Sequence, residues 1–441
     1  MTEIKKGKKI ASGKTKDIYE VDGDPSLVIL ENKDDITKND DPDQTMVMKS
    51  KAFHATKTTS FIFQLLKDAG LPVAFKKQLS PTEFLAPKCQ MIPLEVIIRR
   101  YAVGSYLKRY PNLEKTGNPL RFHKLVFELF LKTTLGKIST MTGEMIGELP
   151  FDILETEKKK FVDDPFIATP YEKHWVLKHP KIPGWDSRSG MNLTVNPEEF
   201  LPNEVTVEMI EEITRQAFLV IEAAWANLGM RLIDFKIEFG VDTFGHLYIA
   251  DVIDNDSWRL RTIDWKETSK QLFRDNESLA IISEKYALVS GMVERFFIPK
   301  QAIVVWCGSE KDKVPEIPLA VAGVEMITVV ASGHKSPQKV INKLEEVLAS
   351  YPQGGVIIPF VGLSNGLGPI LAARTSWPVI NVPAGTDHHD LHSSLALPSE
   401  VPAMTITNFK NAILAALNIL AQKNPAAYMR RQFSLESLEE N

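Results

Sequence analysis

The sequence predicts two domains, an α+β domain over residues 1–297 followed by an α/β domain with a parallel sheet over residues 300–441. The chain has 441 residues, which is too many for one ordinary core. A helical pattern over residues 278–297 ends at Ile298-Pro299, and short apolar strands then alternate with glycine-rich turns. This change of pattern marks the expected domain boundary.

The parallel sheet is predicted from apolar runs that do not alternate with polar residues, as in strands buried on both faces. Such runs cover residues 302–306, 326–330, 356–361 and 378–382, and a helix is expected over residues 408–422. A ligand site is then expected beyond the carboxyl ends of these strands.

The first domain contains one clear long helix and two stretches with little periodicity. Residues 206–227 predict an amphipathic helix with Gly229 as its stop. Residues 136–160 and 165–202 have few periodic apolar positions, so we expect long surface loops there.

Composition and charge exclude several classes of protein. The chain is 44% hydrophobic and 24% charged, which is typical of globular proteins and excludes disordered and fibrous chains. It has 52 basic and 56 acidic residues. From Lys300 onward there are 11 basic and 12 acidic residues, which leaves 41 basic and 44 acidic residues before Lys300. Neither half has the basic excess of a nucleic-acid-binding protein, so we expect small-molecule substrates.

Cysteine usage and the apolar runs indicate the compartment. Only Cys89 and Cys307 occur, which is no disulfide framework. Residues 1–12 lack the apolar segment of a signal peptide, and no apolar run approaches the length of a membrane span. We therefore expect a cytoplasmic protein that does not bind a membrane.

Residues 231–240 alternate in the manner of a half-buried strand, with three charged side chains, Asp234, Lys236 and Glu238, on one face. A turn through residues 242–245 would pair Val241 with His246, place Glu238 opposite Ile249 and put Asp251 diagonally beside Glu238. Two carboxylates at that separation suit Mg²⁺ held between nucleotide phosphates. The alternative is an exposed face of ordinary ion pairs.

Three further segments carry polar groups suited to anions. The Gly13-Lys14-Thr15-Lys16 segment fails as a phosphate loop, because five residues instead of four separate Gly7 from Gly13, but it suits a hairpin lid over phosphates. Arg99 and Arg100 lead into Gly104-Ser105, where bidentate guanidinium groups favour planar anions. Residues 251–259 place many short polar side chains after a strand, as in a loop that binds a metal or an anion.

Four ordered segments resemble the SAICAR synthetase family, the purine-biosynthesis ligases. They are residues 92–105 (IPLEVIIRRYAVGS), 232–240 (LIDFKIEFG), 251–260 (DVIDNDSWRL) and 270–275 (KQLFRD). The resemblance implies an α+β ATP-binding SAICAR synthetase-like domain, which uses ATP to activate the carboxylate of CAIR for attack by L-aspartate. With the second domain, the order resembles the animal bifunctional enzymes that join this ligase to a carboxylase.

The resemblance also implies roles for residues of the first domain. Val103 stands where the family has Thr or Ala, and the Asp-rich loop expected after Lys132 is displaced to Asp163-Asp164-Pro165. The implied residues are Lys14, Lys16, Gln90, Met91 and Glu95 for ATP; Glu238 and Asp251 for Mg²⁺; and Asp34, Arg99, Ser105, Asp234, Lys236, Asp256, Arg259 and Lys270 for CAIR and aspartate.

In the second domain, glycine-rich polar loops follow three of the expected strands and should converge at one edge of the sheet. They resemble AIR carboxylases of the animal type, which convert AIR and CO₂ to CAIR without ATP or biotin on an α/β parallel-sheet (flavodoxin/Rossmann-like) fold. The implied residues are His334, Lys335, Ser364 and Asn365 for catalysis, and Gly308, Ser309, Asp312, Ser332, Gly333, Gly366, Leu367 and Gly368 for AIR and CO₂.

Two motifs in this domain also match other kinds of active site. Gly362-Leu363-Ser364-Asn365-Gly366 satisfies the G-x-S-x-G pattern of serine hydrolases, but the acid and base would be crowded into Asp387-His388-His389-Asp390. His388, His389 and His392 imitate a metal-binding helix, although the local pattern favours a solvated turn.

The second domain departs from the family pattern at four positions: Lys311 replaces a Ser, Gly333 replaces an Ala, and Leu363 and Ala396 each replace an Arg. In addition, Pro315 and Pro318 lie where a family helix is expected. These departures leave an alternative, in which only the ligase is efficient and the second domain is mainly an oligomerisation scaffold. The resemblance also implies a homo-octamer.

Overall fold

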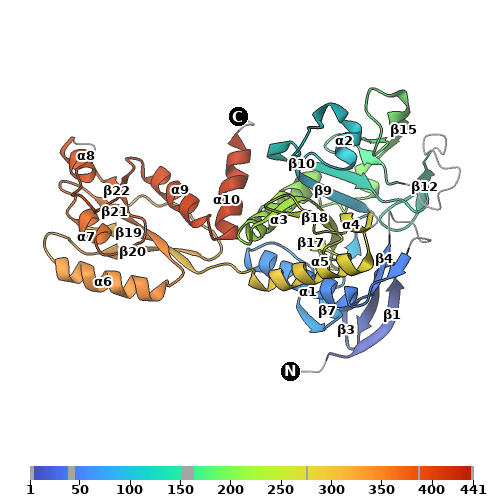
Figure 1. Ribbon diagram of the computed structural model, residues 1–441, viewed down its shortest axis with the longest axis horizontal. Coiled ribbons are helices and arrows are strands. Elements are labelled where there is room, and N and C mark those ends of the chain that lie inside the picture. Colours follow the sequence, from blue (N-terminus) through green and yellow to red (C-terminus); the bar gives the residue numbers. More distant parts are fainter. Residues whose placement is uncertain (1–3, 38–44, 150–162, 275–276, 386–387, 439–441) are drawn as a thin grey trace. The chain divides into compact units, whose positions relative to one another are not determined.

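The computed structural model describes residues 4–37, 45–149, 163–274, 277–385 and 388–438. The chain divides into two compact units, Met1–Phe296 and Phe297–Asn441 (Figure 1). Within the described ranges, no helix is long and apolar enough to cross a membrane.

The first unit begins with an antiparallel five-stranded sheet. Its strands, in spatial order, are β1 (Lys6–Ser12), β2 (Lys16–Val21), β3 (Asp24–Asn32), β7 (Glu83–Pro87) and β6 (Lys77–Ser80). Helix α1 (Lys51–Asp68) packs on this sheet, where Phe63 meets Phe84 edge to face. The hairpin of β1 and β2 carries the glycine and lysine turn, so the predicted hairpin is confirmed.

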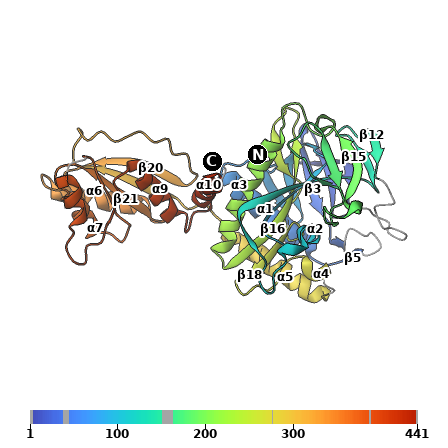
Figure 2. The same ribbon diagram turned by 90° about the horizontal axis from the view of Figure 1, so that it is seen from above.

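A nine-stranded sheet forms the rest of the first unit, with β16 (Met230–Val241) at its centre. The other strands are β15 (Gly190–Val195), β14 (Trp175–Lys178), β13 (Phe166–Ile167), β10 (Arg121–Leu131), β9 (Leu94–Tyr101), β17 (Leu247–Ala250), β18 (Trp258–Thr262) and β8 (Gln90–Met91). Helix α3 (Val207–Ala226) covers one face (Figure 2). The predicted helix is confirmed, and Thr206 caps it by accepting a hydrogen bond from the backbone N–H of Met209.

The smaller elements of the first unit complete its cores. They are the ribbons β4 (Asp35–Thr37) with β5 (Thr45–Val47) and β11 (Lys137–Ser139) with β12 (Met145–Glu148), and the helices α2 (Ser105–Arg109), α4 (Gln271–Arg274) and α5 (Leu279–Met292). The helix predicted over residues 278–297 ends at Met292, and a short 3₁₀ turn follows, because Phe296 turns inward to pack on Trp225.

The prediction of loops over residues 165–202 was wrong in part. Strands β13, β14 and β15 lie there and extend the nine-stranded sheet. They are two to six residues long, too short to give a periodic signal, and burial of Trp175 stacked on Phe200 anchors them. Ribbon β11–β12 likewise occupies part of the stretch expected as a loop over residues 136–160, whose residues 150–160 lie outside the described ranges.

The second unit is built on a parallel sheet, as predicted. Its strands, in spatial order, are β20 (Val324–Val330), β19 (Gln301–Cys307), β21 (Gly355–Val361), β22 (Ile380–Pro383) and β23 (Met404–Thr405). Numbered along the chain this is the order 2-1-3-4-5 of flavodoxin-like sheets. The four predicted strands are confirmed to within two residues at each end.

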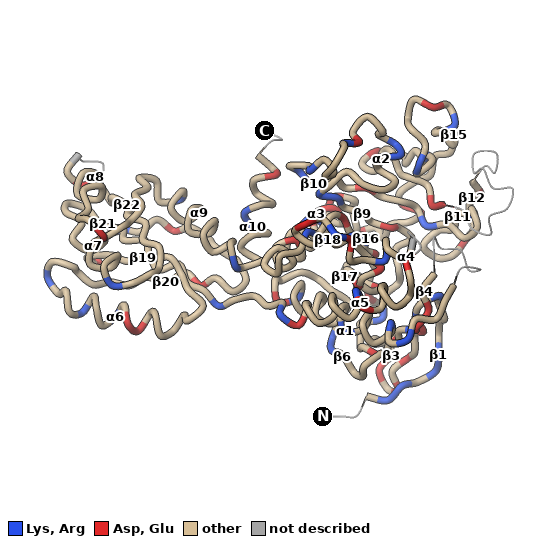
Figure 3. The backbone as a smooth tube through the Cα atoms, in the orientation of Figure 1, with Lys and Arg blue, Asp and Glu red and all other residues tan. Residues whose placement is uncertain are grey.

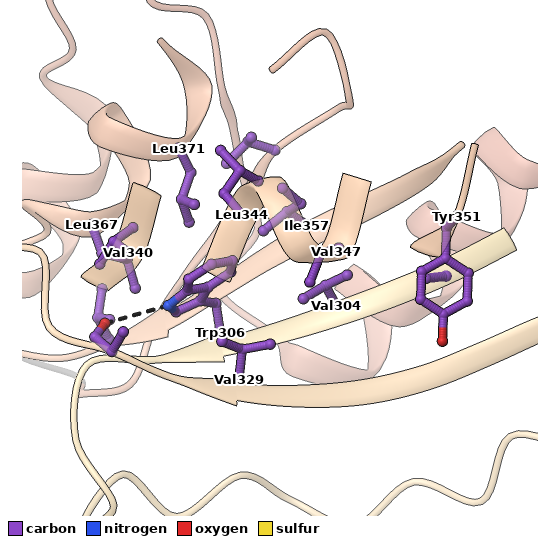
Figure 4. Close-up of a cluster of buried hydrophobic side chains, with 14 residues drawn as sticks. Val304, Trp306, Val329, Val340, Leu344, Val347, Tyr351, Ile357, Leu367 and Leu371 are labelled. Atoms are coloured by element: carbon purple, nitrogen blue, oxygen red, sulfur yellow. Dashed lines mark hydrogen bonds between the residues drawn. The ribbon is translucent and has the colours of Figure 1, made fainter. Parts of the chain in front are cut away.

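Helices cover both faces of the parallel sheet. They are α6 (Pro337–Ser350), α7 (Leu367–Ala372), α8 (His388–Leu395), α9 (Phe409–Leu420) and α10 (Pro425–Glu436). Side chains of α6 and α7 pack around Trp306 on one face, where the Trp306 indole donates a hydrogen bond to the carbonyl of Ala331 (Figure 4). Helix α9 packs on the other face through Phe409 and Leu417.

The connection between β19 and β20 contains no helix, in agreement with its two prolines. Instead, four apolar side chains of this extended segment pack against the core on the α9 side. They are Val314, Ile317, Leu319 and Val321.

Candidate functional sites

The charged face of β16 holds three side chains at alternate positions, and each is paired with a residue from β9 or from the end of β10. Asp234 accepts a hydrogen bond of 2.5 Å from Arg99, Lys236 lies 2.5 Å from Glu95, and Glu238 accepts two bonds of 2.9 Å from Lys132. Figure 3 shows acidic and basic residues interspersed along these strands. Asp234 is only 4% exposed, so this is not an ordinary solvent-facing row of ion pairs.

The predicted register of the next hairpin was wrong by one residue. Val241 pairs with Leu247 and Glu238 with Ala250, because Asp242 accepts hydrogen bonds from the backbone of Phe244 and His246 and so draws His246 into the loop. Asp251 follows the end of β17 with a φ of +66°. Its backbone therefore leaves the extended conformation immediately after Ala250, the residue opposite Glu238.

Both predicted metal ligands carry a lysine partner. Lys16 forms an ion pair with Asp251, and Lys132 pairs with Glu238. Burial would raise the pKa of Glu238, but the ammonium groups of Lys132 and Lys236 outweigh it and hold that pKa low. Burial lowers the pKa of Lys16 to about 8, against the attraction of Glu238 and Asp254. The expected lid lysine and the expected metal ligands thus lie together.

Within the described residues, no group of three or more His, Cys, Asp or Glu side chains could hold a metal by itself. Two carboxylates still fit Mg²⁺, because this ion is commonly held by one or two carboxylates and completed by phosphate oxygens and water.

Asp164 belongs to this part of the site, although the Asp-rich loop lies farther along the chain than the family pattern places it. Its carboxylate accepts hydrogen bonds of 2.7 and 3.0 Å from the backbone and hydroxyl of Thr133, directly after Lys132. Burial, with the charge of Glu95 second, raises the pKa of Asp164 to about 7. The Asp-rich loop therefore returns to the end of β10.

A buried network of arginines and carboxylates lies at the Asp234 end of β16. Arg99 donates to Glu128 at 2.6 Å, to Asp234 at 2.5 Å and to Ser105 at 3.2 Å. Arg259 donates a second 2.5 Å bond to Asp234. Gly104 has a φ of +61°, and a Cβ there would lie 2.6 Å from the Arg259 guanidinium, so only glycine fits.

A third cluster surrounds Asp256. Lys51 and Lys270 lie 3.3 and 3.2 Å from its carboxylate, and the Tyr286 hydroxyl also donates to it. Lys51 is 1% exposed and is the first residue of α1, whose Ala52 N–H donates to Asp34 at 2.9 Å. Two ammonium groups thus share one partly buried carboxylate, that of Asp256, which is itself a predicted CAIR and aspartate residue.

The remaining residues predicted for ATP are more exposed to solvent than the charged face of β16. Lys14 is exposed on the β1–β2 turn, and Met91 is 38% exposed. Gln90 donates a 3.2 Å bond to the carbonyl of Met141 in the loop between β11 and β12. That loop therefore contacts the residue expected at the adenine.

In the second unit, the loops after β19, β20 and β21 carry the predicted carboxylase residues. The Ser309 N–H donates to Asp312 at 2.8 Å, and the Lys335 N–H donates to Ser332 at 3.2 Å. The His334 ring lies against Gly366, where a Cβ would come within 2.4 Å of Nε2. The loops after β20 and β21 are therefore in direct contact, as predicted for strand ends of a parallel sheet.

The departures from the family pattern lie at the surface, except for Gly333. Lys311 and Ala396 are exposed, and Leu363 is 86% exposed with a φ of +63°. A Cβ at Gly333 would lie 3.0 Å from the carbonyl oxygen of Gly366. Glycine at position 333 therefore leaves room for the close contact between the two loops.

The segment considered as a metal-binding helix or as the acid and base of a serine hydrolase is described only in part. Residues predicted as a solvated turn form helix α8, which begins at His388. Asp387, part of the crowded acid and base considered for a serine hydrolase, lies outside the described residues.

Several residues of these sites were not predicted from the sequence. Lys51 and Tyr286 lie in no recognised motif, and Ser394 lies on the helix expected as a turn. Glu128 begins the Glu-Leu-Phe-x-Lys motif that ends at Lys132, but no role was predicted for it. Lys132 and Asp164 were noted in the sequence but given no role. An unusual signal was present only for Lys51, a lysine at the start of a helix whose buried face is otherwise uncharged.

The first unit contains a charged strand and a lysine-rich hairpin, and the second contains a flavodoxin-like sheet. Together the two units define a two-domain enzyme. The family model of SAICAR synthetase matches residues 9–161 and 194–287, and that of AIR carboxylase matches residues 303–438. The chain therefore belongs to the family of bifunctional purine-biosynthesis enzymes that join a SAICAR synthetase to an AIR carboxylase.

Relatives named as multifunctional or bifunctional proteins match over almost the whole chain. The probable multifunctional protein ADE2 of Caenorhabditis elegans is 33% identical, over 94% of this chain and 90% of its own length. The human bifunctional phosphoribosylaminoimidazole carboxylase/phosphoribosylaminoimidazole succinocarboxamide synthetase is 30% identical, over 97% of this chain and 93% of its own. Among solved structures, the phosphoribosylaminoimidazole-succinocarboxamide synthase of Ehrlichia chaffeensis matches with 24% identity and a TM-score of 0.46, over 65% of this chain and 98% of its own.

Proposed function

We propose that residues 1–297 join L-aspartate to CAIR at the expense of ATP, and that residues 300–441 form CAIR from AIR and CO₂ without biotin. The observation that carries the ligase assignment is the charged face of β16. Its side chains for phosphate and metal (Glu238) and for CAIR and aspartate (Lys236 and Asp234) follow one another at every second residue. Substrates bound along this strand would have their reacting groups side by side.

At the Glu238 end, the residues of the chain neutralise and orient phosphate. Lys16 on the β2 strand of the hairpin and Lys132 after β10 supply ammonium groups. Glu238 and Asp251 would hold Mg²⁺, which when bound neutralises the transferring phosphoryl group. Lys14 at the tip of the hairpin would cover the nucleotide from the solvent side, and Glu95 would fix Lys236.

At the Asp234 end, the arginine network would hold the anionic groups of CAIR and aspartate. Arg99 and Arg259 are oriented by Asp234 and Ser105, and both guanidinium groups present planar donors suited to carboxylate or phosphate. Lys270 with Asp256, and Asp34 at the start of α1, would hold the second substrate.

The reaction needs positioning more than a protein nucleophile. A carboxylate oxygen of CAIR attacks the γ-phosphorus of ATP, which releases ADP and leaves an acyl phosphate. The amine of aspartate then attacks the acyl carbon, loses a proton, and expels phosphate to form the amide.

In the second unit, Ser309 and Asp312 would bind the ribose phosphate side of AIR, with Gly308 leaving room for it. Ser332, Gly333, Lys335, Ser364 and the loop Gly366-Leu367-Gly368 would enclose CO₂ and the imidazole. The nucleophilic ring carbon of AIR attacks CO₂, and His334 would accept the ring proton that must then leave.

The test is an assay of purified protein with AIR, bicarbonate, aspartate and ATP, in which CAIR and SAICAR are measured separately. Formation of both products supports the full proposal. Conversion of added CAIR without formation of CAIR from AIR supports the second candidate, a ligase with a scaffold domain, which the exposed departures at Lys311, Leu363 and Ala396 favour.

We also propose a cytoplasmic location and a homo-octamer, with no nucleic-acid partner and no membrane attachment. Light scattering coupled to size exclusion would give the mass of the assembly and would distinguish eight subunits from fewer.

A further inference from the structure

Asn365 was predicted as a catalytic residue, yet its side chain is engaged within the protein. It is 5% exposed; its Oδ1 accepts a 2.8 Å bond from the N–H of Gly368, and its Nδ2 donates a 3.2 Å bond to the hydroxyl of Ser394. Both ends of the amide are therefore occupied by groups of the chain. This arrangement ties together the ends of the Gly366–Gly368 turn and fixes the orientation of the buried amide.

The partner of Asn365, Ser394, is held in turn by two strands. Ser394 is fully buried on α8, and its carbonyl accepts bonds of 3.3 Å from Asn381 on β22 and 2.8 Å from Thr405 on β23. The neighbouring Ser393 hydroxyl accepts a 3.1 Å bond from the N–H of Asn365. The last turn of α8 thus connects the sheet to the loop after β21.

Asn381 fits tightly beneath this loop. It is fully buried, and a Cβ at Gly368 would lie 2.1 Å from its Oδ1. Among the described residues, Oδ1 has no hydrogen-bond donor, an unfavourable state for a buried acceptor. The close fit of Asn381 against Gly368 limits how far the loop can move toward the sheet.

The position of the loop matters because His334 rests on it. Its imidazole Nε2 lies against Gly366, at a distance that leaves no room for a Cβ. A displacement of Gly366 by a few tenths of an ångström would therefore move or release the ring. Catalytic groups lose efficiency steeply when they are misplaced on this scale.

We infer that Asn365 is a positioning residue, and that Ser394 of α8, supported by Asn381, sets the Gly366–Gly368 loop against His334. This inference rests on the proposed carboxylase activity for its kinetic consequence only. Helix α8 contributes no group to the reaction and acts through the loop.

The kinetic test is a double-mutant cycle in the full chain with Ser394→Ala, Asn365→Ala and the double variant. Each single change should lower kcat/KM for AIR carboxylation about ten-fold, the equivalent of one buried hydrogen bond, with KM for AIR little changed. The double variant should be no slower than the slower single variant. Ser350→Ala, which removes a hydroxyl bonded only to its own helix α6, is the matched control.

A second measurement does not require activity. The Gly368 N–H bonds to Asn365, so its hydrogen exchange should be at least ten-fold faster in Ser394→Ala than in the wild type, and unchanged in Ser350→Ala. Unchanged exchange at Gly368 overturns the inference whatever the kinetics show. Wild-type kinetics in Ser394→Ala, together with inactivity of Asn365→Ala, also overturns it and would mean that Asn365 acts on the substrate directly. If the wild type forms no CAIR, the proposed carboxylase fails and the exchange measurement alone decides.

Discussion

Lys132 donates hydrogen bonds of 2.9 Å to both carboxylate oxygens of Glu238. The lysine follows the end of β10 and the glutamate lies on β16, so the pair joins two strands that are separated by β9. Because Glu238 is the expected metal ligand, the lysine ammonium would lie beside the same phosphate oxygens as the metal. On the proposed function, the two strands together would define where the phosphoryl group is transferred.

Removal of the Glu238 charge should separate the two activities. In Glu238→Gln, we expect ATP-dependent SAICAR formation to fall at least about 100-fold, because a neutral amide is a poor ligand for Mg²⁺. Carboxylation of AIR should be unaffected. Both rates are measured on the same preparation, with Glu114→Gln at an exposed position as the control. Normal SAICAR formation by Glu238→Gln would show that the metal assignment is wrong.

The raised pKa of Asp164 predicts a pH dependence of stability. Its folded pKa of about 7 lies above the ordinary value of 3.8, so the folded state keeps the proton to higher pH than the unfolded state. The contribution of this group to stability is therefore complete below about pH 4 and is lost as the pH rises to about 7.

Asp164→Asn removes this titration and should thus become more stable relative to the wild type as the pH rises from 4.5 to 7.5. The measurement is urea unfolding of both proteins across that range. A difference in unfolding free energy that is the same at every pH would contradict the assignment.

Loss of the buried Lys51 ammonium should destabilise the first unit. Lys51→Met leaves Asp256 with one lysine instead of two and leaves Asp254 with Lys270 but without the charge of Lys51. Breaking a buried pair in this way costs about 3 kcal/mol. Lys57→Met, on the same helix, breaks the partly exposed pair with Glu294 and a contact with the Phe53 ring, and it should cost less than about 1 kcal/mol. Denaturant unfolding of the two variants gives the comparison; equal costs would argue against a special role for Lys51.

The two units should fold independently. Phe296 packs on Trp225 in the first unit, so a fragment of residues 1–296 keeps its last core contact. We expect this fragment to unfold cooperatively and to bind ATP, and residues 297–441 to unfold cooperatively on their own. Calorimetry of each fragment and of the full chain checks this. Aggregation of both fragments would mean that the cores depend on each other.

The sequence predicted local structure well and long-range pairing poorly. The alternation that places Asp234, Lys236 and Glu238 on one face is a property of the strand itself, so it was visible without the fold. The register beyond Val241 depended on which backbone groups Asp242 would bond, which the pattern alone does not specify.

The partners of the charged site residues could not be predicted either, because they are distant in the sequence. Asp164 reaches Thr133 across an insertion, and Lys51 reaches Asp256 from 205 positions earlier in the chain. Only tertiary packing brings such groups together, and a single sequence carries no record of it. In contrast, the glycine-rich strand ends of the second unit were predictable, because parallel sheets gather their carboxyl ends at one edge.

His334 decides between a carboxylase and a scaffold. If the loops after β20 and β21 form a CO₂ site, His334→Ala should remove most AIR carboxylation and spare the ligase, since proton handling belongs only to the first step. A scaffold would show no change, because it would form no CAIR to begin with. We expect the wild type to be active but slow, since exposed Leu363 and Ala396 offer no charge where the family pattern has arginine. The measurement is CAIR formation at saturating AIR and bicarbonate, with conversion of added CAIR to SAICAR as the internal control. A wild type that forms no CAIR while it converts added CAIR normally would leave the scaffold as the function of the second unit.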